Sequence, residues 1–237
     1  MALDERRIAF LGAGHITKII LDNLVKTKKL PSHRLIASDP AKTKLQQLSD
    51  KYKIIMANDN VEAVDKGDFV FINVPPQVVG DVIDELSLKG FPNDTLIITL
   101  AAGIPIKAYE RLGDNIPVAR ALPNPPSQIG MGIAALAFNS VVTDEQRSDI
   151  FELFAALGEY VVLREENINT VMALSSPVTP MVSSKLAVSW LLYLLDSTSP
   201  CSVNLIWPCT VPAGCARMDS WVGPPPRPMV PPRPWNR

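Results

Sequence analysis

Short, almost continuous apolar runs alternate with amphipathic stretches up to about residue 165, and this alternation constrains the fold more than any other feature. The runs "RIAFL", "RLIAS", "FVFIN" and "TLIITL" are each long enough for one strand, and stretches of helical periodicity separate them. A parallel sheet with helices on both faces needs strands that are apolar throughout, because both faces are buried. The pattern predicts an α/β fold with a doubly wound, mainly parallel sheet.

Later runs extend the same sheet. Residues 117–124, 132–139 and 159–165 read as further strands, and residues 143–158 read as a helix that begins at Thr143 or Asp144. Either residue can accept a hydrogen bond from a backbone amide of the first helical turn. We therefore expect one continuous sheet up to about residue 165.

The first apolar run ends in "GAGHIT", and an amphipathic stretch follows it directly. Gly12 and Gly14 match the first two glycines of G-x-G-x-x-G, and Thr17 occupies the third position. A helix N-terminus offers free amides and a positive dipole end to a pyrophosphate. The pattern favours a dinucleotide site in a Rossmann-like sheet, with a plain strand-to-helix turn as the alternative. Thr17 either pushes the helix outward or directs its hydroxyl at a phosphate.

The second predicted strand ends at Ser38 and Asp39, where the ribose of a bound adenosine is expected. A carboxylate accepts hydrogen bonds from a free 2′-hydroxyl and repels a 2′-phosphate, so Asp39 favours NAD. Lys42 and Lys44 follow closely and favour NADP. The predicted cofactor is therefore NADP or NAD. We expect His15 to face solvent or a phosphate rather than to act as a general base.

Composition argues against several other classes of protein. A net charge of −1 gives no reason to expect nucleic acid as a partner, because phosphate binding needs Lys and Arg clustered on one face. With two histidines and the spacing of Cys201, Cys209 and Cys215, no metal site is expected. The apolar stretch 185–197 is shorter than the about 20 residues of a membrane span and reads as a buried helix. The N-terminus does not resemble a signal peptide, so we expect a cytoplasmic protein without membrane contact.

The composition changes after residue 165. Ten of the 22 prolines lie at or after Pro200, and no glutamate follows Glu166. Proline lacks an amide donor and fixes φ, so it is excluded from helix interiors and central strands. We predict a dinucleotide-binding domain over residues 1–165, a truncated or atypical helical segment over 166–199, and a disordered proline-rich tail over 200–237.

The order of these motifs resembles the pyrroline-5-carboxylate reductase family over about residues 6–178. The family's G-A-G-N-M-A-type loop corresponds to residues 12–17, and its A-V-K-P segment corresponds to residues 73–76. The strand followed by A-A-G is kept as "IITLAAG". The most specific match is R-x-M-P-N-T-P, which appears as "RALPNPP" at residues 120–126.

The resemblance implies the following site. Residues 12–17 bind pyrophosphate, Ser38 and Asp39 contact the ribose, Asn60 contacts the adenine half, and segments 73–76 and 101–102 line the nicotinamide. The implied cofactor contacts are Gly12, Ala13, Gly14, His15, Ile16, Thr17, Ser38, Asp39, Asn60, Asn73, Val74, Pro75, Pro76, Ala101 and Ala102. The substrate candidates are Asn124, Ser175 and Ser176, where the two serines could equally cap a helix.

The chain also departs from the family pattern. Pro75 and Pro125 replace the lysine and the threonine of two motifs, and the family's S-P-G-G-T loop does not occur. The catalytic residue is unknown from the sequence. Arg120 reads as a structural ion-pair partner rather than as a clamp for a carboxylate. The family implies a homo-oligomer, which the atypical C-terminal part makes doubtful.

The resemblance implies reduction of 1-pyrroline-5-carboxylate to proline by hydride transfer from NAD(P)H. A small imino acid would then be the substrate, and positioning rather than a strong protein base would carry the reaction. Two alternatives stay open. One is a nucleotide-binding module without turnover, and the other is a related dehydrogenase that acts on another small imine or hydroxy acid.

Overall fold

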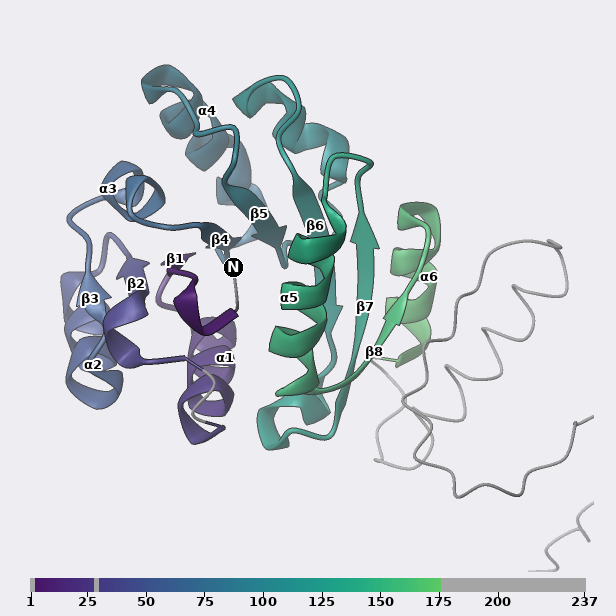
Figure 1. The fold of residues 1–237 in the computed structure, drawn as a ribbon, viewed down its shortest axis with the longest axis horizontal. Helices are drawn as coiled ribbons and strands as arrows, with labels where there is room; N and C mark the ends of the chain where they lie inside the picture. Colours follow the sequence, from purple (N-terminus) through teal and green to yellow (C-terminus); the bar gives the residue numbers. More distant parts are fainter. Residues whose placement is uncertain (1–2, 28–29, 176–237) are drawn as a thin grey trace, which may run out of the picture. The chain divides into compact units, whose positions relative to one another are not determined.

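The computed structural model describes residues 3–27 and 30–175. Within those residues one 8-stranded sheet has the order β3-β2-β1-β4-β5-β6-β7-β8 (Figure 1). The strands are β1 (Ile8–Leu11), β2 (Leu35–Ser38), β3 (Ile55–Met56), β4 (Phe69–Ile72), β5 (Leu96–Thr99), β6 (Val118–Pro123), β7 (Gly132–Phe138) and β8 (Gly158–Val162). All neighbours pair in parallel except β6 and β7, which are antiparallel. The predicted mainly parallel α/β sheet is confirmed.

Helices cover both faces of the sheet. They are α1 (His15–Lys26), α2 (Lys42–Tyr52), α3 (Asn60–Asp65), α4 (Val79–Lys89), α5 (Asp144–Ala155) and α6 (Glu165–Ser175). One core contains side chains of α1, α2 and α5, and the other contains side chains of α3, α4 and α6. Successive residues of a strand point to opposite faces, so β1 sends Ile8 and Phe10 into the first core and Ala9 and Leu11 into the second.

The central strands are buried along their whole length, as their apolar runs predict. All four residues of β1 and all four of β4 are buried, and the rings of Phe10 and Phe71 stack with centroids 5.0 Å apart. Full burial of one such side chain contributes about 1.5–3 kcal/mol. The sheet is therefore the buried frame from which the loops project at the two ends of the strands.

Two details differ from the sequence-based expectation. The predicted strand at residues 53–59 shrinks to Ile55–Met56, which lies at the edge of the sheet with side chains 39% and 43% exposed. A 3-10 helix, η4 (Ile106–Leu112), occupies a segment for which no element was predicted. Ile106, Tyr109 and Leu112 recur every third residue and are buried, which is the period of a 3-10 helix.

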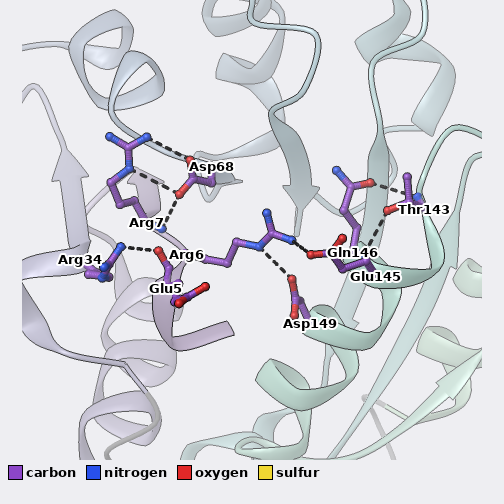
Figure 2. Close-up of polar contacts among 9 residues, drawn as sticks. All are labelled: Glu5, Arg6, Arg7, Arg34, Asp68, Thr143, Glu145, Gln146 and Asp149. Atoms are coloured by element: carbon purple, nitrogen blue, oxygen red, sulfur yellow. Dashed lines mark hydrogen bonds and ion pairs between the residues drawn. The ribbon is translucent and has the colours of Figure 1, made fainter. Parts of the chain in front are cut away.

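Charged side chains link neighbouring elements at the amino-terminal ends of the strands (Figure 2). Arg6, just before β1, donates from Nε to Asp149 of α5 at 2.9 Å, and its NH2 group contacts Glu145 at 2.8 Å. Arg7 pairs with Asp68 before β4, through its backbone amide at 2.8 Å and its guanidinium at 3.0 Å. The first strand is thereby anchored both to a covering helix and to its neighbouring strand.

Helix α5 begins with a capping box, which confirms the predicted start. The Thr143 hydroxyl accepts from the Gln146 amide at 3.2 Å, and the Gln146 side chain accepts from the Thr143 amide at 3.0 Å (Figure 2). We expect Thr143→Ala to lower the free energy of unfolding by about 1 kcal/mol, because one helix amide loses its acceptor. Urea unfolding measures this change. Thr143→Ser should stay close to wild type, and equal losses in both variants would contradict the capping role.

Asp68 should make stability depend on pH. Burial acts to raise the pKa of Asp68, but the hydrogen bonds and charge of Arg7 outweigh it and hold the pKa below its usual range. The unfolded chain therefore takes up this proton first as pH falls, so the contribution is present at neutral pH and is lost as pH falls through the folded pKa. We expect Asp68→Asn to cost at most about 1 kcal/mol at neutral pH, because the pair is partly exposed. In urea unfolding the difference from wild type should shrink as pH falls through the lowered pKa of Asp68; a constant difference would contradict this assignment.

Candidate functional site

The strand order reverses between β1 and β4, so a topological switch point lies at the carboxyl ends of these two strands. After β1 the chain crosses to β2 and β3 on one side, and the next strand, β4, lies on the other side of β1. Ligands of open α/β sheets bind at such a switch point. Gly12 follows β1 and Asn73 follows β4, and the Asn73 amide donates to the Leu11 carbonyl at 2.9 Å. The glycine-rich loop therefore lies at the switch point.

Gly12 and Gly14 have different roles in this loop. Gly12 adopts φ +105°, and a Cβ there would lie 2.8 Å from the Asn73 carbonyl oxygen, so only glycine fits. Gly14 is the N-cap residue of α1, with no side-chain hydrogen bond to the first turn, and a Cβ there would meet nothing within 4 Å. The helix N-terminus is therefore uncapped by the protein and open to an anion.

Thr17 braces the loop from inside. Its side chain is fully buried, its hydroxyl donates to the Gly12 carbonyl at 2.6 Å, and it accepts from Asn73 Nδ2 at 3.1 Å. The hydroxyl is committed within the protein, so any contact between Thr17 and a phosphate would have to use its backbone. Through this one hydroxyl, Thr17 of α1 is bonded to Gly12 at the end of β1 and to Asn73 at the end of β4, so the helix packs directly against both strand ends. Asn73 Oδ1 is buried without a hydrogen-bond partner in the described part of the chain.

Asp39 holds the loop from the side of β2. One carboxylate oxygen accepts from the Ala13 amide at 2.7 Å, and the other accepts from the Ala41 amide at 2.8 Å. The Gly12 amide donates to the Ser38 carbonyl at 2.9 Å. The predicted pyrophosphate loop and the predicted ribose position are therefore adjacent and directly bonded.

Asn60 joins the predicted adenosine side to α4. The Ser38 hydroxyl donates to Asn60 Oδ1 at 2.7 Å, and Asn60 Nδ2 donates to Glu85 Oε2 at 2.7 Å. The structure thus brings together Ser38, Asp39 and Asn60, which lie far apart in the sequence. Glu85 was not among the candidates, because nothing in the helical pattern of α4 distinguishes it from a solvated carboxylate.

The residues predicted to line the nicotinamide belong to two segments, which follow the carboxyl ends of two neighbouring strands. Residues 73–76 follow β4, with Pro75 and Pro76 exposed, and Ala101 and Ala102 follow the neighbouring parallel strand β5. Ala101 is buried and Ala102 is exposed. The topology therefore places residues 73–76 beside the glycine-rich loop and residues 101–102 beside residues 73–76.

A buried pair that the sequence did not reveal supports the turn after β5. The Thr99 hydroxyl bonds to the Tyr109 hydroxyl and also accepts from the Ala101 amide at 3.3 Å. Burial raises the pKa of Tyr109 to about 12, against the opposing effects of Thr99 and Arg120, so the phenol stays neutral and can donate. The only signal in the sequence was an aromatic residue in the unassigned segment 104–113.

The structure describes just part of the predicted substrate side. Asn124 is buried, its Oδ1 accepts from the Ile133 amide at 2.8 Å, and its Nδ2 has no partner among the described residues. Ser175 is the last residue of α6, and its side chain is not described. Ser176 lies outside the described residues, as do the three cysteines, stretch 185–197 and tail 200–237.

Arg120 is an ion-pair partner, which confirms the prediction. Its buried guanidinium contacts Glu165 Oε1 at 3.3 Å and donates to Asn169 Oδ1 at 2.7 Å. Glu165 also accepts from the Ile106 amide at 2.6 Å. Both acceptors of Arg120 belong to α6, so this pair fixes α6 to the sheet.

His15 is exposed at the start of α1, and its Nε2 lies 3.0 Å from Gln128 Nε2. Its position agrees with the expected solvent-facing role. Within residues 3–27 and 30–175, no cluster of three or more His, Cys, Asp or Glu residues could hold a metal ion. In the same ranges, no helix has the length and apolar character needed to cross a membrane.

The two loop glycines predict opposite outcomes for the same substitution. Gly12→Ala should destabilise the fold by about 1–3 kcal/mol, because it forces an unfavourable φ and a clash with the Asn73 carbonyl. Gly14→Ala should change the free energy of unfolding by less than about 0.5 kcal/mol, because the added methyl group meets no protein atom. Urea unfolding of both variants tests this contrast, and a Gly12→Ala protein as stable as wild type would refute the close approach.

Known proteins share both the sequence and the fold. The family model described as "NADP oxidoreductase coenzyme F420-dependent" matches residues 7–103. The pyrroline-5-carboxylate reductase of Vibrio alginolyticus is 32% identical over 173 residues, which cover 72% of this chain and 63% of the relative. The reductase of Pseudomonas aeruginosa is 33% identical over 171 residues, which cover 71% of this chain and 62% of the relative. The chain thus spans less than two thirds of the length of these relatives.

Solved structures show the same fold. The pyrroline-5-carboxylate reductase of Coxiella burnetii aligns with a TM-score of 0.68 at 22% identity and covers 83% of this chain and 82% of its own. The pyrroline carboxylate reductase of Plasmodium falciparum, solved with NADP bound, aligns with a TM-score of 0.62 at 16% identity and covers 88% and 87%. The motifs, the sequence matches and the fold agree, and over the part that its relatives match the chain is similar to pyrroline-5-carboxylate reductases.

Proposed function

We propose that this chain binds NADH or NADPH at the switch point and reduces 1-pyrroline-5-carboxylate to proline. The observation that carries the proposal is the loop of residues 12–17, which lies against Asn73 at the switch point in a chain 32% identical to a pyrroline-5-carboxylate reductase. The uncapped N-terminus of α1 and the open space at Gly14 fit a pyrophosphate. The nicotinamide, when bound, would supply the hydride.

The proposed roles follow the order of the strands. Residues 12–17 hold the pyrophosphate, Ser38 and Asp39 contact the ribose, and Asn60 contacts the adenine half. The proposed walls of the nicotinamide pocket are Asn73, Val74, Pro75, Pro76, Ala101 and Ala102, and the proposed substrate contacts are Asn124, Ser175 and Ser176. Residues 1–165 would then form the dinucleotide-binding domain.

Positioning is the main task of the protein in this reaction. A protonated ring nitrogen makes the imine carbon electrophilic, so the chain needs to align two rings and to hold the substrate carboxylate. Pro75 and Pro76 restrict the backbone beside the pocket, since each ring fixes φ. The unpartnered Nδ2 of buried Asn124 supports a role in binding an anionic group, because a buried amide without an acceptor is costly.

A second candidate is nucleotide binding without turnover. The matched segment covers only 62% and 63% of the length of the two relatives above, and the substrate side depends on Asn124 and on serines whose side chains the structure does not describe. In that case the loop would retain its function while the reaction would be lost. The predicted homo-oligomer and the predicted cytoplasmic location stay predictions.

An oxidation assay separates the candidates. We expect NADH or NADPH oxidation by the purified full chain to require 1-pyrroline-5-carboxylate. Gly14→Ala should lower kcat/KM for the nucleotide by roughly tenfold or more, because its methyl group would occupy the path of the pyrophosphate while the fold is kept. The stability of Gly14→Ala serves as the control.

The other outcomes are also decisive. Nucleotide binding with no substrate-dependent oxidation would establish the second candidate. Oxidation with a different small imine or hydroxy acid, but not with 1-pyrroline-5-carboxylate, would identify a related dehydrogenase. A chain that binds neither nucleotide would refute the proposed function.

A further inference from the structure

We infer that Asp39 makes the nucleotide site select NADH over NADPH. The inference rests on the proposed nucleotide-binding function and deepens it, since it names the cofactor that the conflicting charges in the sequence left open. It follows from three features of the structure: a fixed carboxylate, two lysines that do not face each other on their helix, and a second carboxylate on the same side of the site.

The carboxylate of Asp39 is fixed in place at the end of β2. Its two oxygens accept from the Ala13 and Ala41 amides at 2.7 and 2.8 Å, so the loop after β1 and the segment before α2 both hold it. A carboxylate can accept about four hydrogen bonds, so each oxygen still has a lone pair for a ribose hydroxyl. A 2′-phosphate would meet a negative charge that cannot rotate away without breaking two backbone hydrogen bonds.

The neighbouring cations are poorly arranged to offset this charge. Lys42 Nζ donates to the Asn58 carbonyl at 2.6 Å, which draws its ammonium group toward the segment before α3. Lys44 follows two positions later on α2, and residues two apart on a helix do not face each other. The two lysines therefore do not converge on one position where a 2′-phosphate could bind. The indication of NADP that they gave in the sequence is correspondingly weak.

No arginine occurs between residues 35 and 60, the span that connects β2 to α3. Arg34 precedes β2, at the opposite end of the strand, where its guanidinium donates to the Glu5 carbonyl (Figure 2). A guanidinium is the group best suited to bind a 2′-phosphate, because its planar fork matches the phosphate oxygens. The ribose side of this site lacks that group among residues 35–60.

A second carboxylate adds to the negative charge on this side. Glu85 accepts from Asn60, which in turn accepts from the Ser38 hydroxyl beside Asp39. A 2′-phosphate would carry additional negative charge toward both carboxylates, whereas a 2′-hydroxyl carries none. The chain thus differs from what the solved relative of Plasmodium falciparum, with NADP bound, would suggest.

Direct binding tests the inference without requiring turnover. The full chain is titrated with NADH and with NADPH, and the fluorescence of the reduced nicotinamide reports binding. We expect NADH to bind at least about tenfold more tightly. Asp39→Ser and Asp39→Asn should move the ratio of the two affinities toward one. Asp94 lies just before β5, at the amino-terminal ends of the strands and so away from the proposed site. Asp94→Asn removes the same charge there and should leave the ratio of the two affinities unchanged.

Salt gives a second measurement on the unaltered chain. Because ions screen repulsion between charges, raising the salt concentration should reduce the preference for NADH. This readout stands even where an Asp39 variant, having lost acceptors for two backbone amides, proves unstable in urea unfolding.

Each outcome is decisive. Equal or tighter binding of NADPH by the wild-type chain would overturn the inference while leaving the proposed function intact. A preference for NADH that persists in folded Asp39 variants would overturn the assignment to Asp39. Binding of neither nucleotide would refute the proposed function, and the inference with it.

Discussion

The close approach of Gly12 to the backbone of Asn73 is the constraint on which the site depends. A side chain at Gly12 would lie 2.8 Å from the Asn73 carbonyl oxygen, so the ends of β1 and β4 can come together only around glycine. This contact sits where the strand order reverses, and it directs the chain into α1 with an uncapped N-terminus. The sheet topology supplies the switch point, and glycine at this one position permits the close approach of the two strand ends.

The ion pairs that stabilise the sheet and the residues of the proposed site lie at opposite ends of the strands. At the amino-terminal ends, the ion pairs of Arg6 and Arg7 link β1 to α5 and to the start of β4. At the carboxyl-terminal ends, Thr17 and Asp39 form hydrogen bonds with the glycine-rich loop. The loop is thus held by buried or fixed polar groups.

Local sequence patterns predicted most of the fold. The central strands follow from apolar runs, because a strand buried on both faces consists mostly of apolar residues. The start of α5 follows from Thr143, since capping depends on residues within one turn. The sequence was less informative about η4 and about the short β3, because an edge strand has a single partner and its length depends on that neighbour. The pair of Thr99 and Tyr109 was missed because its two hydroxyls meet only after η4 packs on the sheet.

The sequence alone determined the alternation of strands and helices, the glycine-rich loop and the resemblance to pyrroline-5-carboxylate reductases, because each rests on short-range periodicity or on motifs contiguous in the chain. The tertiary structure decided how polar residues from different strands are used. Thr17 could have faced a phosphate, yet it bonds to Gly12 and Asn73; Lys42 could have faced the ribose, yet it bonds to the Asn58 carbonyl. The physical reason is that a hydrogen bond depends on which groups the fold brings within reach, and spacing along the chain does not specify this for strands that pair across crossovers.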